Sequence, residues 1–427
     1  MHWKDRKRYL WLCGLAVPLS PFVAWALVQY LHLGLFWAFG ALLIAVIVPL
    51  VDRFTGVDKA NPPEELVREL EEDRYYRWCT YLYLPLQYAG LVFACWVWTV
   101  APMGWPERFA MAATVGVVGG VGINAAHELG HKRTDLERRL AKIALAQSGY
   151  GHFFVEHNHG HHLRVATPED AATARFGESY WKFLPRSVFG GLRSGWRYER
   201  ERLARRGLPW WSPRNNVLNA WVLTVALYAG LIAVFGWSVA PWLIVQAVLA
   251  VMFLEAANYL EHYGLLREQR PDGSYVRVAP RHSWNSDHSC SNLFLYHLQR
   301  HSDHHANPLR RYQTLRTMEE APQLPAGYAV MILLSFVPSL WRKVMDPRLL
   351  EHYDGDVSRA NLDPARRATL FARHRREAHP RPRRAVPFRP GPRQRDALPD
   401  AGPWAEVHDA DQTTALCRRR GRQAPSR

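Results

Sequence analysis

The chain has 427 residues and a formal net charge of +16, and hydrophobic residues make up 48% of it. Five scattered cysteines without a C-x-x-C pair indicate neither a disulfide framework nor a cysteine metal knuckle. The charge does not indicate a nucleic-acid partner, because +10 of it lies in residues 366–427, where sixteen arginines face six acidic residues.

Six long apolar runs predict an all-α, polytopic membrane protein. Each run is close to the ~20 apolar residues that a helix needs to cross a bilayer. The expected spans are residues 9–31, 33–51, 80–100, 107–126, 217–236 and 239–260. The first run follows basic residues as a signal peptide does, but it is too long and another span follows at once. We therefore expect it to be a retained anchor.

Basic residues before the first span predict that the N-terminus faces the cytoplasm. They are Lys4, Arg6, Lys7 and Arg8. Counting the spans forward places both termini inside, together with the segments 52–79, 127–216 and 261–427. We expect residues 127–216 and 261–365 to form a histidine-rich helical cap on that side. Residues 366–427 are rich in arginine and proline, which predicts a disordered tail.

Nine histidines follow or separate the apolar runs, at the expected cytoplasmic boundary. They are His127, His131, His157, His161, His162, His262, His301, His304 and His305. The first two continue the fourth span one helical turn apart, so their imidazoles share a face. Clustered imidazoles repel one another when charged, so the presence of so many histidines close together in the sequence indicates neutral metal ligands. One tetrahedral zinc takes about three or four protein ligands, so nine histidines fit two metals better.

Two other classes of function compete for these residues. His127-Glu128-x-x-His131 matches a zinc protease signature, but an intramembrane protease leaves the other seven histidines unexplained. A metal transporter or store needs ionisable side chains inside its spans, and we expect no charged residue there. Both interpretations are therefore weaker than a two-metal enzyme.

Four longer strings around these histidines resemble the bacterial membrane alkane hydroxylases, within the wider group of membrane di-iron desaturases and hydroxylases. They are HELGHK from His127, EHNHGHH from Glu156, NYLEHYG from Asn258 and LQRHSDHHANP from Leu298. The last string continues as RYQTLR from Arg311. The resemblance covers about residues 5–365 and stops at the tail.

The resemblance implies a bacterial inner-membrane monooxygenase that hydroxylates the terminal carbon of n-alkanes with dioxygen. It implies a non-haem centre of two irons, and all nine histidines match the family's iron ligands. Fused rubredoxins carry paired C-x-x-C motifs, whereas this tail has only Cys417. The expected electron donor is therefore a separate rubredoxin with its reductase. Related hydroxylation of aryl methyl groups and desaturation of fatty acyl groups are the nearest alternatives.

Further polar residues stand close to these histidines in sequence. Carboxylates commonly hydrogen-bond the second nitrogen of a metal-bound imidazole, so we expect that role for the acidic neighbours. Direct metal binding by one of them is the alternative, since bridging carboxylates are usual in soluble di-iron bundles. These neighbours are Glu128, Glu156, Glu261 and Asp303. Five more histidines match no ligand position, and we expect them at the surface or behind the ligands. They are His152, His159, His282, His288 and His297.

Basic residues on the inward loops predict a docking face for an acidic electron carrier. They are Arg133, Arg138, Arg139, Arg193, Arg197, Arg300, Arg310, Arg311 and Arg316. Within the fourth span, glycines either clear room for an alkane or allow close helix packing. They are Gly116, Gly119, Gly120 and Gly122. Bulky side chains are expected to set the alkane length, with Phe36, Trp37, Phe39 and Trp96 as candidates.

Overall fold

The computed structural model describes residues 4–375, and within them the chain is helical with only isolated β-bridges. Six helical segments are long and apolar enough to cross a membrane. They are Arg8–Leu31, Gly34–Thr55, Arg74–Val100, Trp105–Gly130, Asn216–Phe235 and Trp237–Glu261. Each overlaps one predicted span, so the prediction of an all-α polytopic membrane protein is confirmed.

The spans differ in regularity. They are built from η1 (Arg8–Leu15), α1 (Ala16–Leu31), η2 (Gly34–Ala38), α2 (Phe39–Leu42), η3 (Leu43–Ile47), α3 (Val48–Thr55), α5 (Arg74–Tyr81), α6 (Tyr83–Val100), α7 (Trp105–Gly130), α12 (Asn216–Phe235), η6 (Trp237–Val239) and α13 (Ala240–Glu261). Local signals set the ends of α12. The Asn215 side chain accepts hydrogen bonds from the first backbone N–H groups, and Gly236 ends the helix with φ +81°.

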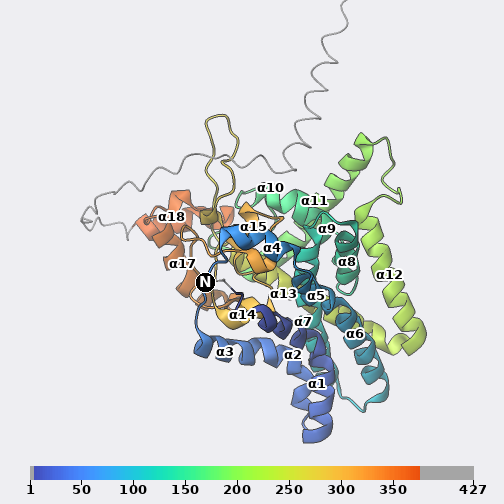
Figure 1. Cartoon of the computed structure of the whole chain (residues 1–427). Coiled ribbons are helices and arrows are strands. Elements are labelled where there is room, and N and C mark those ends of the chain that lie inside the picture. The colour runs from blue at the N-terminus through green and yellow to red at the C-terminus, as the bar shows by residue number, and fades with distance from the viewer. Residues whose placement is uncertain (1–3, 376–427) are drawn as a thin grey trace, which may run out of the picture. The chain divides into compact units, whose positions relative to one another are not determined.

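Shorter helices connect the spans and form the cap. They are η4 (Glu64–Leu66), α4 (Val67–Glu72), α8 (Asp135–Ala146), α9 (Phe153–Glu156), η5 (His157–His161), α10 (His162–Arg164), α11 (Tyr180–Arg205), η7 (Pro280–His282), α14 (Ser289–Phe294), α15 (His301–Ala306), η8 (Tyr312–Thr314), α16 (Tyr328–Ser335), α17 (Pro338–His352), η9 (Val357–Arg359), η10 (Pro364–Arg366) and α18 (Arg367–Arg375). Figure 1 shows α9, α10 and α15 at one end of the bundle and the turn after α6 at the other.

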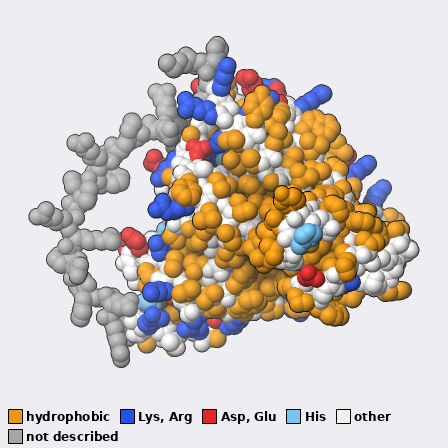
Figure 2. Space-filling view, turned by 90° about the horizontal axis from the view of Figure 1, so that it is seen from below, with side chains coloured by type: hydrophobic (Ala, Val, Ile, Leu, Met, Phe, Trp, Pro, Cys, Tyr) orange, Lys and Arg blue, Asp and Glu red, His pale blue; other side chains and the backbone are white. Residues whose placement is uncertain are grey.

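The face at the turn end is apolar. Hydrophobic side chains cover most of the surface seen from that end (Figure 2). Large apolar side chains exposed on the spans include Leu35, Val225, Val234 and Trp237. An apolar surface this broad suits contact with lipid rather than water.

Glycines allow α7 and α13 to lie close together. A Cβ atom at Gly116 would lie 2.8 Å from the Leu249 side chain, and one at Gly120 would lie 2.7 Å from Phe253. Larger residues do not fit here, so these glycines serve close helix packing. Because α7 ends in the first histidine motif and α13 ends just before His262, this packing brings the two motifs together.

The expectation that the spans carry no charged residue is wrong. Glu255 lies within α13, and its side chain is buried with 1% of the residue exposed. One charged residue barely lowers the mean hydropathy of such an apolar segment, so the span is still predicted although the sequence contains the glutamate. A carboxyl at this depth needs hydrogen-bond partners and is often functional.

The first residues of the segment expected to be a disordered tail form a helix. Helix α18 continues the ordered chain to Arg375, and its Leu370 is 2% exposed. The ring of His374 lies 5.9 Å from that of Phe176, and Arg366 donates a 3.0 Å hydrogen bond to the Gly177 carbonyl. The remainder of the expected tail, residues 376–427, lies outside the described residues.

A chain ending at Asp363 is therefore expected to be less stable than one ending at Arg375. The shorter chain loses the buried Leu370, and burial of one leucine contributes about 2 kcal/mol. Thermal unfolding in detergent measures the difference. Equal unfolding midpoints for the two truncated chains would contradict a structural role for α18.

Candidate metal centre

The nine predicted histidines gather into two adjacent groups. Each group places one ring nitrogen per residue within 4.8 Å of all the others. The five-histidine group contains His127, His131, His157, His162 and His304. The four-histidine group contains His161, His262, His301 and His305. Sequence spacing predicted the set of residues but not this division.

The five-histidine group draws on three parts of the chain. His127 and His131 come from the end of α7, where a four-residue step places both rings on one face. The Nε2 atom of His304 on α15 lies 2.9 Å from Nε2 of His127. His157 and His162 complete the group, with their Nε2 atoms 3.0 Å apart.

The four-histidine group is built around α15. His301 and His305 lie one turn apart on this helix, with Nε2 atoms 2.9 Å apart. His262 follows α13 directly, and its Nε2 lies 3.2 Å from that of His301. His161 completes the group from the π-helical turn η5.

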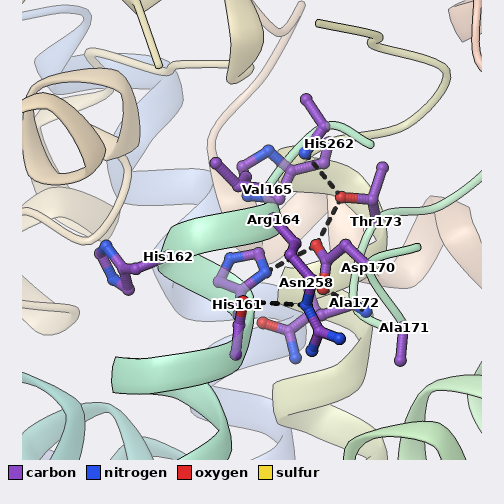
Figure 3. Close-up of polar contacts among 12 residues, drawn as sticks. His161, His162, Arg164, Val165, Asp170, Ala171, Ala172, Thr173, Asn258 and His262 are labelled. Atoms are coloured by element: carbon purple, nitrogen blue, oxygen red, sulfur yellow. Dashed lines mark hydrogen bonds and ion pairs between the residues drawn. The ribbon is translucent and has the colours of Figure 1, made fainter. Parts of the chain in front are cut away.

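The π-helical turn separates two neighbouring histidines. Residues five apart align in such a turn, which explains why His157 and His162 share a group. His161 then faces the other group. Figure 3 shows the His161 ring directed toward Asp170, while the His162 ring points the opposite way. One short segment therefore contributes to both groups.

Burial keeps most of these rings uncharged. It is the main cause that lowers the pKa of His301 and His304 well below the usual value, and neighbouring imidazoles lower the pKa further. Burial likewise lowers the pKa of His262 to about 3. The same direction and first cause apply to the pKa of His131, His157, His162 and His305. Neutral imidazole is the form that binds metals.

Asp170 orients His161, and the sequence analysis missed it. Its Oδ2 lies 2.8 Å from Nδ1 of His161 and accepts a 2.6 Å hydrogen bond from the Thr173 hydroxyl. Burial disfavours charge on His161, but the carboxylate outweighs burial and raises the pKa of this ring. Donation from Nδ1–H to Asp170 leaves Nε2 facing the other histidines. Asp170 lies in the loop between α10 and α11, outside the histidine motifs, so no motif marks it in the sequence.

The backbone orients His262 in a similar way. Its Nδ1–H donates a 3.1 Å hydrogen bond to the carbonyl of His282, leaving Nε2 to face His301. The turn after His262 is also fixed. Gly264 has φ +73°, and a Cβ there would collide with the Leu349 side chain, so a larger residue does not fit.

The four carboxylates beside the motifs behave differently from one another. Glu261 touches a ring, with its Oε2 3.3 Å from Nε2 of His301. The other three pair with cations, Glu128 with Lys132, Glu156 with Arg164, and Asp303 with Arg310. These three carboxylates therefore bind cations, and Glu261 contacts the Nε2 atom of His301 that faces the other histidines rather than the second nitrogen of the ring. A nearby cation binds a carboxylate more strongly than a neutral imidazole does.

The five additional histidines belong to neither group in the described part of the chain. His282 is buried and supplies the carbonyl that holds His262. His297 is also buried and donates to the Tyr312 carbonyl, whereas His288 bonds Ser286. His152 is buried and His159 half-buried.

Part of the predicted docking face is wrong as well. Arg300 is fully buried and donates hydrogen bonds to the carbonyls of Asp58 and Leu315. Three further arginines bind acidic side chains, Arg310 with Asp303, Arg311 with Glu137 and Arg316 with Glu64. The exposed members of the predicted set are Arg133, Arg139, Arg193 and Arg197.

The donor set fits metal cations. Nε2 of His301 faces the Nε2 atoms of two other histidines, yet a neutral imidazole carries only one N–H. The Nε2 atoms of His131 and His161 are buried and have no hydrogen-bond partner in the described part of the chain. Converging, unprotonated nitrogens of this kind are satisfied by a bound cation. The geometry therefore indicates a metal centre with two neighbouring positions.

Comparisons with known proteins agree with this arrangement. The model of the fatty acid desaturase family matches residues 103–335. Alkane 1-monooxygenase 1 of Alcanivorax borkumensis is 46% identical, over 85% of this chain and 90% of the relative. Alkane 1-monooxygenase of Ectopseudomonas oleovorans is 45% identical, over 86% of this chain and 92% of the relative. The hydroxylase component of a Pseudomonas putida xylene/toluene monooxygenase is 29% identical, over 53% of this chain and 60% of the relative. The chain therefore belongs to the alkane 1-monooxygenase family, within the wider fatty acid desaturase family.

Proposed function

We propose that the protein is a rubredoxin-dependent membrane monooxygenase that converts n-alkanes to 1-alkanols with dioxygen. The observation that carries the proposal is the pair of adjacent all-histidine groups at the end of an apolar helical bundle. The names of the relatives support alkanes as the substrate class. The histidine end faces the cytoplasm of a bacterial inner membrane in this proposal, because basic residues precede the first span.

Two irons are the metals that we propose for the centre. Imidazole binds iron, zinc, copper and nickel alike, so the ligands do not identify the metal. We infer its identity from the proposed reaction instead. Bound iron supplies the activation of dioxygen that no side chain can carry out. The nine histidines hold and orient the metals, and their burial limits the access of water. Asp170 and the His282 carbonyl fix the orientation of two of the rings.

The zinc protease interpretation lacks support from this geometry. The signature's Glu128 lies 3.0 Å from the ammonium of Lys132 and accepts a hydrogen bond from the Tyr312 backbone N–H. A general base needs its carboxylate within reach of a metal-bound water. The same interpretation leaves the second group of histidines without a role.

The apolar bundle accounts for recognition of a substrate without polar groups. An alkane is bound through shape and buried apolar area. A cluster of buried apolar side chains surrounds Trp37 near the turn end of the bundle, and it includes Trp98, Met111 and Val115. Thr114, which donates to the Trp37 carbonyl, lies thirteen residues before His127 on α7. This separation corresponds to ~20 Å along a helix.

Replacing Trp37 with alanine is expected to shift product formation toward longer alkanes. The side chain is 3% exposed, so its removal opens space inside the bundle. Competition between octane and hexadecane, followed by gas chromatography of the alcohols, measures the shift. Trp96→Ala is the matched control, because Trp96 is 42% exposed and lies on the outer surface. An unchanged product ratio in Trp37→Ala would contradict this assignment.

Electron transfer from rubredoxin is expected to depend on salt. The exposed arginines of the histidine end attract an acidic carrier, and ions screen this attraction. The kcat/KM for a separate rubredoxin should fall as ionic strength rises, and it should fall at low salt in a combined Arg193→Gln and Arg197→Gln variant. A kcat/KM that changes neither with ionic strength nor in the arginine variant would contradict docking at this face.

Isotope labelling tests the reaction itself. The purified protein receives octane, oxygen-18 gas and reduced rubredoxin with its reductase. The proposal predicts 1-octanol that carries one oxygen-18 atom. Unlabelled alcohol or no alcohol would contradict it. Parallel assays with p-xylene and a fatty acyl substrate test the two related activities.

A further inference from the structure

Glu255 is held deep in the bundle by a set of polar groups. The Tyr150 hydroxyl donates a 2.7 Å hydrogen bond to its Oε1, and the Asn258 amide donates one of 3.1 Å to the same atom. The second oxygen, Oε2, is buried and has no hydrogen-bond partner among the residues that the structure describes. An ionisable residue inside a membrane span is costly to bury, so its presence indicates a function.

A small cavity opens beside this carboxyl. Its volume is about 10 Å³, which accommodates about one water molecule. The lining includes Glu255, Tyr150, His152, Ser187 and Asn258. Nε2 of His152 is likewise buried and has no hydrogen-bond partner within residues 4–375. A water molecule needs two to four polar partners, and the two unpartnered atoms together with Ser187 meet that need.

The cavity lies directly beside the metal centre. His157 of the five-histidine group forms part of its wall, and so does Glu156. Glu156 pairs with Arg164 at 3.3 Å, and the Arg164 side chain is 20% exposed. Arg164 also donates a 2.6 Å hydrogen bond to the Ser194 hydroxyl. A line of polar groups therefore runs from near the surface to Glu255 and His157.

The proposed reaction requires protons at this buried place. Dioxygen, the alkane, two electrons and two protons give one alcohol and one water. The O–O bond breaks, one oxygen enters the terminal C–H bond, and the other leaves as water with both protons. Rubredoxin supplies the electrons. The histidines bind metal through unprotonated nitrogens, so the protons must come from other groups.

We propose that Glu255 and a water molecule in the adjoining cavity deliver these protons to the metal centre. The inference rests on the proposed function. Glu255 passes a proton to the cavity water beside His157 and regains one from solvent water that exchanges with the cavity. Tyr150 and Asn258 hold the carboxyl in position for this transfer. Glu255 is not among the predicted metal-binding residues, so its replacement is expected to leave the metal in place.

Glu255→Gln separates proton delivery from structure. The amide keeps the size of the side chain but cannot pass on a proton. We expect unchanged iron content, a kcat lowered about 100-fold and a larger solvent deuterium isotope effect. More of the consumed dioxygen should leave as hydrogen peroxide rather than alcohol. Glu255→Asp retains an acid and should recover part of the rate.

Gln246→Leu is the matched control. It removes another fully buried polar side chain from α13, away from the cavity. This variant should retain the isotope effect and peroxide yield of the wild type. Should Glu255→Gln lose iron, Tyr150→Phe removes the hydroxyl that holds the carboxyl and should raise the isotope effect. A wild-type kcat and isotope effect in Glu255→Gln would overturn the inference while leaving alkane hydroxylation intact. Absence of alcohol from the wild type would instead contradict the proposed function.

Discussion

Replacing His161 with alanine should remove metal from the four-histidine group and abolish alkane hydroxylation. His161 is 1% exposed, and its Nε2 has no hydrogen-bond partner among the described residues. Loss of one of four converging ligands leaves too few nitrogens to retain a cation against water. We expect about one of two irons to be lost per chain, measured by metal analysis of the purified protein.

His159→Ala is the control for this experiment. His159 lies two residues from His161, but it is half-buried and belongs to neither group. Its replacement should retain both irons and most of the activity. Equal metal loss in the two variants would contradict the assignment of His161, because it would show that the segment tolerates no change.

Replacing Asp170 with asparagine should weaken metal binding about 10- to 100-fold, the usual effect of losing a carboxylate that orients a metal-binding imidazole. The new side chain retains the size of the original one, yet its amide can present a donor to Nδ1 and disturb the orientation of the His161 ring. Titration of the metal-free protein with Fe²⁺ under anaerobic conditions measures the affinity.

The adjacent Glu169→Gln variant controls for loss of charge in this loop. Glu169 is exposed, and its carboxylate contacts the Tyr275 hydroxyl rather than a histidine. It should bind iron as the wild type does. Wild-type affinity in Asp170→Asn would show that the His161 ring is held in place without the carboxylate.

The sequence predicted the spans well because membrane crossing imposes a length and an apolar composition on each helix. It also predicted which histidines come together, because each motif places ring nitrogens at a helix end. The π-helical turn that separates His161 from His162 is a backbone choice that the motif does not encode. Without it, the division into five and four histidines could not be predicted.

The remaining misses concern contacts between distant segments. Asp170 lies in a loop, and only the fold brings it to His161. Arg300 lies beside a motif, yet the fold buries it against the backbone of Asp58. Sequence spacing cannot distinguish an arginine that is buried against the backbone from one that is exposed on a surface where another protein can bind. Glu255 was the exception, because its position within an apolar span was visible in the sequence.

Metal content and product formation in one preparation test the central claim most directly. The protein is purified in detergent, its iron and zinc are counted, and octane, dioxygen and reduced rubredoxin are supplied. The account predicts about two irons per chain, one for each histidine group, and formation of 1-octanol. A single zinc, no iron and no alcohol would contradict it.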